Sequence, residues 1–161
     1  MNIRWVRRFK QELKGALYVQ VLRTSLECCE NMLLVTRKTV TLSQTIPDFL
    51  SLLEQWLISS TLTDRWPGTT LLFGGKANVH RYRWTSQCQR TLLQYSDGLY
   101  DWRQPALPED LCLIRADGDP WLITIAHEKD AYLKVTDDEL SALLDDLPDL
   151  SSLLDLTRKY E

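Results

Sequence analysis

The chain has 161 residues and a mass of 18.8 kDa, with 44% hydrophobic and 25% charged residues. This length predicts a single globular domain over residues 1–161, and this composition excludes a disordered or collagen-like chain. No apolar run reaches the roughly 18–20 residues that cross a bilayer, and the first thirty residues lack the apolar stretch of a signal peptide. We therefore expect a cytoplasmic protein that does not enter the membrane.

The net charge is −3 at pH 7, and it is unevenly distributed along the chain. Residues 1–40 carry eight Lys or Arg and three acidic residues, whereas residues 136–161 carry two and eight. This acidic balance, without zinc-finger or ribonucleoprotein motifs, disfavours nucleic acid as a partner. Three interpretations are open: the two ends attract each other or are solvated faces, the acidic end binds a basic protein, or the basic head binds nucleic acid.

The four cysteines do not have the paired spacing of a zinc site, and adjacent cysteines such as Cys28 and Cys29 rarely bond to each other. We expect reduced thiols that serve as small apolar residues. The sequence therefore predicts no metal and no cofactor.

The N-terminal half contains two predicted helices and two predicted strands. Residues 2–14 show helical spacing of apolar side chains and end at a glycine, which predicts a basic amphipathic helix. Residues 17–26 and 32–42 are rich in Val, Leu and Thr, which predicts an antiparallel hairpin. Residues 44–60 return to helical spacing behind the capping residue Thr45.

The middle of the chain predicts a second hairpin. Residues 69–73 and 78–84 are strand-like, and Gly74-Gly75 between them is typical of a tight turn. A helix is predicted over residues 85–95, with Thr85 as its cap.

The C-terminal half predicts a three-stranded meander followed by two helices. The strands are expected at residues 111–115, 121–126 and 131–135, with a turn at Asp117-Gly118. Thr136 and Glu139 form a capping box that opens a helix ended by Pro148, and a last helix is expected over residues 149–159. The whole pattern predicts the α+β class: an antiparallel sheet built from hairpins and a meander, with helices packed on one side and at the C-terminus.

No catalytic constellation stands out. His127-Glu128 lacks a second histidine four residues from the first, because position 131 is Ala, and this excludes the zinc-peptidase motif. Cys112, His127 and Asp130 form a conceivable nucleophile system without any local signature, and Gly74-Gly75-Lys76 lacks the spacing of a phosphate loop. We expect no catalytic residue and a non-enzymatic protein.

Two alternatives stay open. One is a small enzyme or ligand-binding domain that uses His127 and Glu128. The other is a regulatory domain whose basic N-terminal helix contacts nucleic acid or anionic lipid.

Residues 99–133, with the sequence LYDWRQPALPEDLCLIRADGDPWLITIAHEKDAYL, resemble a stretch of small uncharacterised bacterial proteins of toxin-immunity type. The segment Leu107-Pro108-Glu109-Asp110-Leu111 also resembles a phrase of the broad immunity superfamily of the yeast cell-wall regulator type, although here it leads into a predicted strand and there into a helix.

The resemblance implies an inhibitor that binds and neutralises a cognate toxin, which we expect to be a basic protein domain. Carboxylates then supply electrostatic attraction, and aromatic side chains, which are enriched at protein interfaces, supply the anchors. A homo-oligomer is also compatible with the sequence. The predicted partner-binding residues are Asp137, Asp138, Glu139, Asp145, Asp146, Asp149, Trp102, Trp121 and Tyr132.

Overall fold

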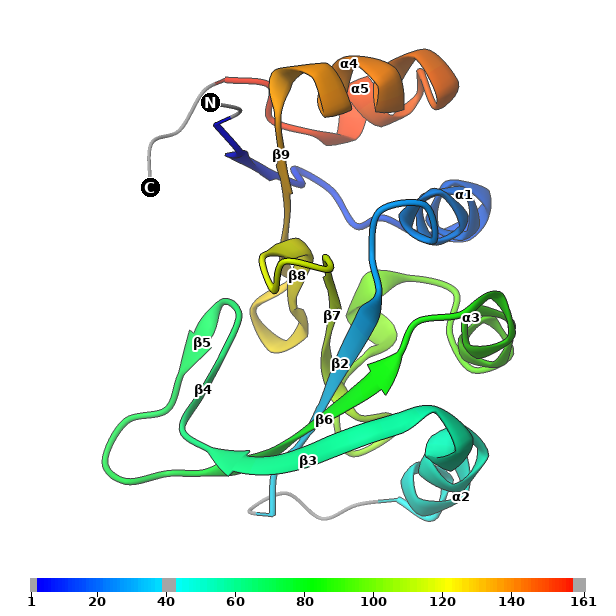
Figure 1. Cartoon of the computed structure of the whole chain (residues 1–161). Coiled ribbons are helices and arrows are strands. Elements are labelled where there is room, and N and C mark those ends of the chain that lie inside the picture. Colours follow the sequence, from blue (N-terminus) through cyan, green and yellow to red (C-terminus); the bar gives the residue numbers. More distant parts are fainter. Residues whose placement is uncertain (1–2, 39–42, 158–161) are drawn as a thin grey trace.

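A computed structural model describes residues 3–38 and 43–157. Within them, seven strands form one antiparallel sheet in the order β1-β9-β8-β7-β2-β6-β3, and two short strands form the separate ribbon β4-β5 (Figure 1). The strands are β1 (Trp5–Arg8), β2 (Asn31–Thr36), β3 (Leu57–Thr63), β4 (Arg65–Trp66), β5 (Thr69–Thr70), β6 (Ala77–Arg83), β7 (Glu109–Ile114), β8 (Pro120–Ile125) and β9 (Asp130–Val135).

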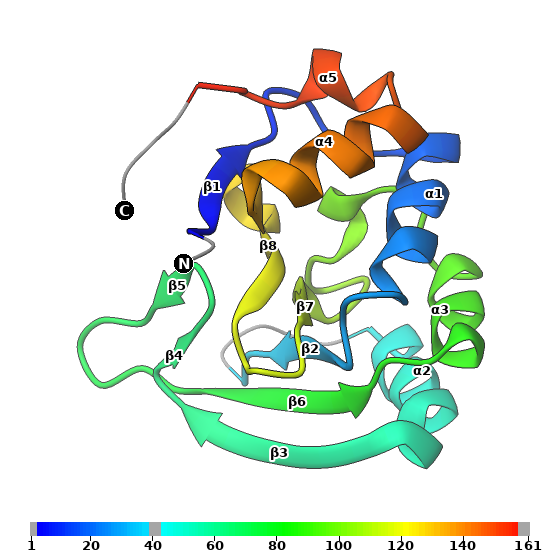
Figure 2. The ribbon, with the colours of Figure 1, turned by 45° about the horizontal axis from the view of Figure 1, so that its top comes forward.

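The α-helices lie on one side of the sheet and at one end of it, while the β4-β5 ribbon stands on the other side (Figures 1 and 2). This arrangement confirms the predicted α+β class. None of the described helices combines the length and apolarity required to cross a membrane. The helices are α1 (Gly15–Ser25), α2 (Thr45–Leu53), α3 (Ser86–Leu93), α4 (Asp137–Asp146) and α5 (Leu150–Leu153).

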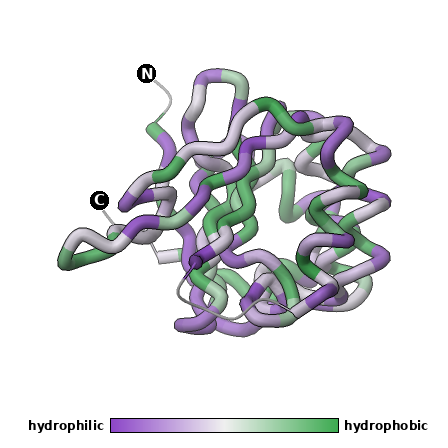
Figure 3. Tube along the Cα trace, turned by 90° about the horizontal axis from the view of Figure 1, so that it is seen from below, coloured by the Kyte–Doolittle hydropathy of each residue, from purple (hydrophilic) through white to green (hydrophobic). Residues whose placement is uncertain are grey.

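The main hydrophobic core lies between the helices and the sheet. Its largest fully buried side chains include Trp102, Tyr18 and Phe49, and Trp102 donates its indole N–H to the Tyr18 hydroxyl at 2.9 Å. A smaller cluster on the opposite face of the sheet contains Leu33 and Cys112. Figure 3 shows apolar chain segments gathered in the middle of the molecule, with an apolar tip protruding on the ribbon side.

The predicted meander is confirmed. Strands β7, β8 and β9 are consecutive neighbours, and Gly118 takes a φ of +86° in the turn between the first two. The capping box is also confirmed, because the Thr136 hydroxyl accepts from the Glu139 N–H at 3.1 Å and the Glu139 carboxylate accepts from the Thr136 N–H at 2.8 Å. The predicted helix capped by Thr85 is α3. These features depend on contacts between residues close in sequence.

The strand predicted at residues 32–42 is confirmed by β2 over residues 32–36, but the two predicted elements before it were wrong. Residues 5–8 form strand β1, which pairs with β9, and residues 15–25 form helix α1 instead of a strand. The segment 17–26 fits both periods, but its buried residues follow helical spacing; these are Tyr18, Val21, Leu22 and Ser25. The predicted hairpin therefore does not exist, and β2 pairs with β6 and β7.

Three further boundaries were wrong. Helix α2 ends at Leu53, and residues 57–60 of the predicted helix belong to strand β3, which pairs with β6. The Gly74-Gly75 pair does not join paired strands, since β5 pairs with β4 through the turn at Pro67-Gly68. The last helix is only α5, after which Leu154 forms a bridge with Phe9. Residues 39–42 and 158–161 of the predicted elements lie outside the described part.

Gly68 lets the turn of the β4-β5 ribbon pack closely against Ile123 and Ile125 of the sheet. Its φ is +83°, and a Cβ atom at this position would lie 2.8 Å from Ile123 Cγ2. We expect Gly68→Ala to lower the free energy of unfolding by about 2–4 kcal/mol, because the cost of a left-handed backbone at alanine and the cost of overpacking against Ile123 add.

Gly118→Ala is the matched control. Gly118 also has a positive φ, but nothing lies within 4 Å of its Cβ position. This control should lose only about 1–2 kcal/mol in chemical denaturation. Equal losses in the two variants would show that the ribbon does not pack against Ile123 as described.

Candidate protein-binding surface

The C-terminal acidic residues lie on and beside α4 and α5, at the end of the molecule opposite α2 (Figure 1). Asp138, Asp145, Asp146 and Asp149 are exposed. None of the four takes part in an ion pair with another residue of the described ranges. Their charge is therefore directed to solvent.

Asp145 and Asp146 occupy the last turn of α4, and no basic residue shares that turn. The C-terminal end of a helix carries a partial negative charge, so carboxylates there are unfavourable for the free protein. Asp138 lies in the first turn of the same helix, where a negative charge is favourable. Only the C-terminal pair thus opposes the stability of its own helix.

Asp137 and Glu139 have structural partners. The Arg115 guanidinium donates to both Glu139 oxygens at 2.6 and 3.0 Å, and Arg7 donates to Asp137 at 3.2 Å. Both arginines are buried, with exposed side-chain fractions of 6% and 3%. Burial raises the pKa of Glu139, but the hydrogen bonds from Arg115 and from the Thr136 N–H lower it below its usual value.

A groove of about 160 Å³ is lined by residues of α1, of the turn after it, of β8 and β9, and of α4. Glu27, Glu139 and Asp146 supply acidic groups to its lining. Its apolar lining consists of Trp121, Val135, Leu143 and Ala142, and Thr24 and Cys28 complete it. An acidic rim above apolar side chains suits a Lys or Arg, whose stem packs on apolar surface while its charge meets carboxylates.

We call Glu27, Asp138, Asp145, Asp146 and Asp149 the acidic surface. Glu27 belongs to the turn after α1 and was not among the predicted binding residues. No sequence signal identifies it, because the segment before it was interpreted as a strand. Only the packing of α1 beside α4 brings Glu27 and Asp146 to one groove.

Two predicted aromatic anchors do not lie at the surface. Trp102 is fully buried and Trp121 is 3% exposed, so neither reaches a partner directly. Both fill the core between sheet and helices, which corrects their assignment as contact residues. Trp121 still takes part in the lining of the groove. Tyr132 is half-buried on β9 and donates its hydroxyl to Asp130 at 2.6 Å.

The three arginines of the N-terminal segment form ion pairs within the molecule. Arg4 forms ion pairs with Asp117 at 2.7 Å and Asp119 at 2.9 Å, and Arg8 pairs with Asp130 at 2.7 Å. Because residues 5–8 also form a strand, the alternative of a basic amphipathic helix that binds lipid or nucleic acid has no structural basis here. The attraction between the two chain ends is realised in the ion pair of Arg7 with Asp137.

The predicted nucleophile system is not assembled. Cys112 is fully buried, and burial raises the pKa of its thiol to about 12, so the thiolate is scarce at neutral pH. Asp130 is engaged by Arg8 and Tyr132. His127 is exposed, and its Nε2 atom lies 3.7 Å from Oε1 of Glu128.

His127 does approach two buried carboxylates, Glu109 and Asp110, with one ligand atom of each residue within 4.8 Å of the others. Both Asp110 oxygens already accept hydrogen bonds at 3.0 Å, from the Trp66 indole and the Ala126 N–H. Glu109 pairs with Arg37 at 2.7 Å. A cation there would have to displace these donors, so this set fits a structural role better than a metal site.

Burial raises the pKa of both carboxyls in this cluster. Asp110 has a φ of +58° at a bulge of β7, and this bulge directs its side chain toward Trp66 on the ribbon. Glu109 and Asp110 belong to residues 99–133, the segment that resembles immunity-type proteins. Asp110 joins the ribbon to the sheet through its hydrogen bond with Trp66.

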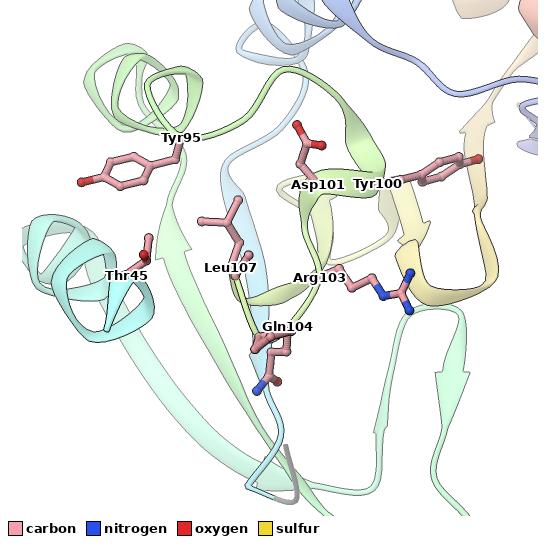
Figure 4. A pocket seen from close by; sticks show the side chains of 9 residues that line it. Thr45, Tyr95, Tyr100, Asp101, Arg103, Gln104 and Leu107 are labelled. Carbon is pink, nitrogen blue, oxygen red and sulfur yellow. The ribbon is translucent and has the colours of Figure 1, made fainter. Parts of the chain in front are cut away.

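A cavity of about 590 Å³ is lined by Thr45 of α2, Tyr95 and the loop 100–107, and His127 is not among its lining residues (Figure 4). Its labelled side chains include Tyr100, Asp101 and Arg103, which point in different directions and not to a common centre (Figure 4). The side chain of Gln104 is hydrogen-bonded to the backbone of Arg37. Its amide N–H donates to the Arg37 carbonyl at 3.2 Å, and its amide oxygen accepts from the Arg37 N–H at 2.6 Å. The cavity therefore presents no convergent set of polar groups of the kind that binds a small molecule.

Glu139 allows a test that separates structure from binding. At pH 7, Glu139→Gln should lower the free energy of unfolding by about 1–2 kcal/mol, because it leaves buried Arg115 without its anion while solvent already screens part of the pair. A carboxyl with a lowered folded-state pKa stabilises the fold above its unfolded pKa and loses this contribution as pH falls through the folded value. The difference should therefore vanish as pH falls below about 4 in urea titrations.

Glu54→Gln is the control for this titration, because Glu54 is exposed and has no ion pair among the described residues. It should leave stability unchanged at both pH values. A Glu139→Gln loss that persists undiminished at acidic pH would contradict the ionic role.

Comparisons of the chain with protein-family models, with curated proteins and with solved structures found no match.

Proposed function

We propose that this protein is a non-enzymatic, immunity-type inhibitor of a bacterial toxin, and that it binds a basic toxin domain through the acidic surface. One observation carries the proposal. Asp145 and Asp146 place two negative charges at the C-terminal end of α4, where the helix dipole makes them least favourable. The groove beside them is lined by two further acidic residues, Glu27 and Glu139. Residues that oppose local stability in this way are typical of functional sites.

The charge distribution supports the same partner chemistry. Intramolecular pairs neutralise Arg4, Arg7 and Arg8, whereas the carboxylates of the acidic surface face solvent. A cluster of one sign accelerates encounter with a partner of opposite sign and repels other acidic molecules. Toxins that act on nucleic acids are basic at their substrate cleft, and an acidic inhibitor would cover such a cleft.

The helix-dipole argument makes a prediction for the free protein. Asp145→Asn/Asp146→Asn should raise the free energy of unfolding by about 0.3–1 kcal/mol per residue at low ionic strength. Asp138→Asn, at the favourable end of α4, should lower it by a similar amount. Chemical denaturation at two salt concentrations measures both changes. Effects of the same sign in both variants would contradict the placement of these charges.

The binding experiment uses the product of the adjacent gene as the candidate toxin. Titration calorimetry should detect a stable complex, and Asp145→Asn/Asp146→Asn should weaken it about threefold to thirtyfold, mostly through slower association. The loss should shrink in high salt. Asp48→Asn/Glu54→Gln, which removes two exposed charges at the opposite end of the molecule, should leave the affinity unchanged.

Cys28 provides a second readout in the groove. It is half-buried, while the other three cysteines are buried, and a hydrogen bond with the Cys29 thiol lowers the pKa of Cys28. An alkylating reagent should therefore modify Cys28 first, and bound partner should slow this reaction. A complex that forms with unchanged alkylation and unchanged affinity in the double variant would overturn the assigned surface. No complex with the neighbouring product would overturn the proposed function.

A further inference from the structure

Strand β3 is an open edge of the sheet. It pairs with β6 on one side only, and all seven of its residues are exposed or half-exposed. Its sequence, LISSTLT, contains no charged residue and no proline. An edge strand of this kind presents unpaired backbone donors and acceptors and is a template for another strand.

The other edge of the sheet is protected. Strand β1 has only four residues, and its Arg7 and Arg8 form ion pairs with Asp137 and Asp130. Charged side chains and short length are the usual means by which proteins blunt an edge. The contrast identifies β3 as the edge at which pairing is not prevented.

Exposed apolar side chains concentrate around the same edge. Of the eight large hydrophobic residues exposed in the described ranges, six lie between positions 52 and 73. Phe73 is completely exposed, and its neighbour Leu72 is 71% exposed. The six are Leu52, Leu57, Ile58, Leu62, Leu72 and Phe73. Three of them, Leu57, Ile58 and Leu62, lie on β3 itself, and exposed apolar side chains on an open edge favour contact with another chain.

We propose that a second copy of this chain covers β3, so that two sheets join into one continuous antiparallel sheet across a two-fold axis. This inference does not depend on the proposed function. Antiparallel pairing of β3 with itself places no like charges opposite each other, because the strand is uncharged. A strongly basic partner gains nothing from an uncharged strand, which favours self-association over binding of the toxin at this edge.

The register of this pairing follows from the geometry of β3. A bulge interrupts its pairing with β6 between Leu57 and Ser59, and the pairing is regular from Ser59 to Thr63. Thr61 is the central residue of that regular part. With Thr61 on the two-fold axis, Ser59 lies opposite Thr63 of the second copy, and each opposed pair shares a sheet face.

The two copies would leave both acidic surfaces free. In Figures 1 and 2, β3 lies at one end of the molecule and α4 with α5 at the other. Dimerisation and binding of a basic partner are therefore compatible, and their tests are separate.

The experiment measures oligomeric state and proximity across the axis. In a Cys28→Ser background, Thr61→Cys should form an intermolecular disulfide under mild oxidation, because opposed Cβ atoms in such pairs lie about 4.5–5.5 Å apart. Thr70→Cys, at another exposed threonine in the short strand β5, should not. Sedimentation velocity should show a dimer of the wild-type chain.

Thr61→Lys places two like charges opposite each other and should weaken the dimer at least about tenfold, while Thr70→Lys leaves it intact. Circular dichroism checks that the variants fold. A wild-type chain that is monomeric at every concentration, or a dimer that Thr61→Lys does not weaken, would overturn the proposal. A wild-type monomer that binds an extended peptide at β3 would equally show that the occupant is another protein.

Discussion

The pairing of β1 with β9 is the constraint on which the electrostatic character of the molecule depends. It places the N-terminal arginines beside acidic residues of the turn between β7 and β8 and of the β9 region. Arg7 becomes buried in this arrangement and holds both Asp137 and the Leu156 carbonyl. Arg4, Arg7 and Arg8 are thereby paired inside the fold, whereas Asp138, Asp145, Asp146 and Asp149 form no ion pair with another residue of the described ranges.

The same packing gives the acidic residues two different roles. Glu139 closes a capping box and neutralises Arg115, so its carboxylate is a part of the fold. Asp145 and Asp146, one or two turns later on the same helix, have no such partner among the described residues and oppose the helix dipole. A partner with Lys or Arg side chains would compensate this charge, and the turn after α1 contributes Glu27 to the same groove.

The two surfaces of the molecule differ in chemistry. The acidic surface is charged and formed by residues of α4 and of the turns after α1 and before α5, whereas the β3 edge is uncharged and offers its backbone. Charge determines encounter rate and excludes wrong partners, while an open strand edge selects only for an extended segment. The buried cluster of Glu109, Asp110 and Trp66 lies between sheet and ribbon and keeps the ribbon in place.

The sequence by itself determined the features that depend on neighbours along the chain: the turn at Asp117-Gly118, the meander around it and the capping box of Thr136 with Glu139. The acidic residues of α4 and Asp149, just before α5, could also be recognised, since exposure of charged residues follows from the cost of burying them. The sequence did not distinguish helix from strand over residues 5–25, because both periods fit and only distant partners select one. Pairing of β1 with β9 across more than a hundred residues, the burial of Trp102 and Trp121, and the juxtaposition of Glu27 with Asp146 were decided by the tertiary structure. Such contacts arise from the competition of all segments for one core, which no local pattern contains.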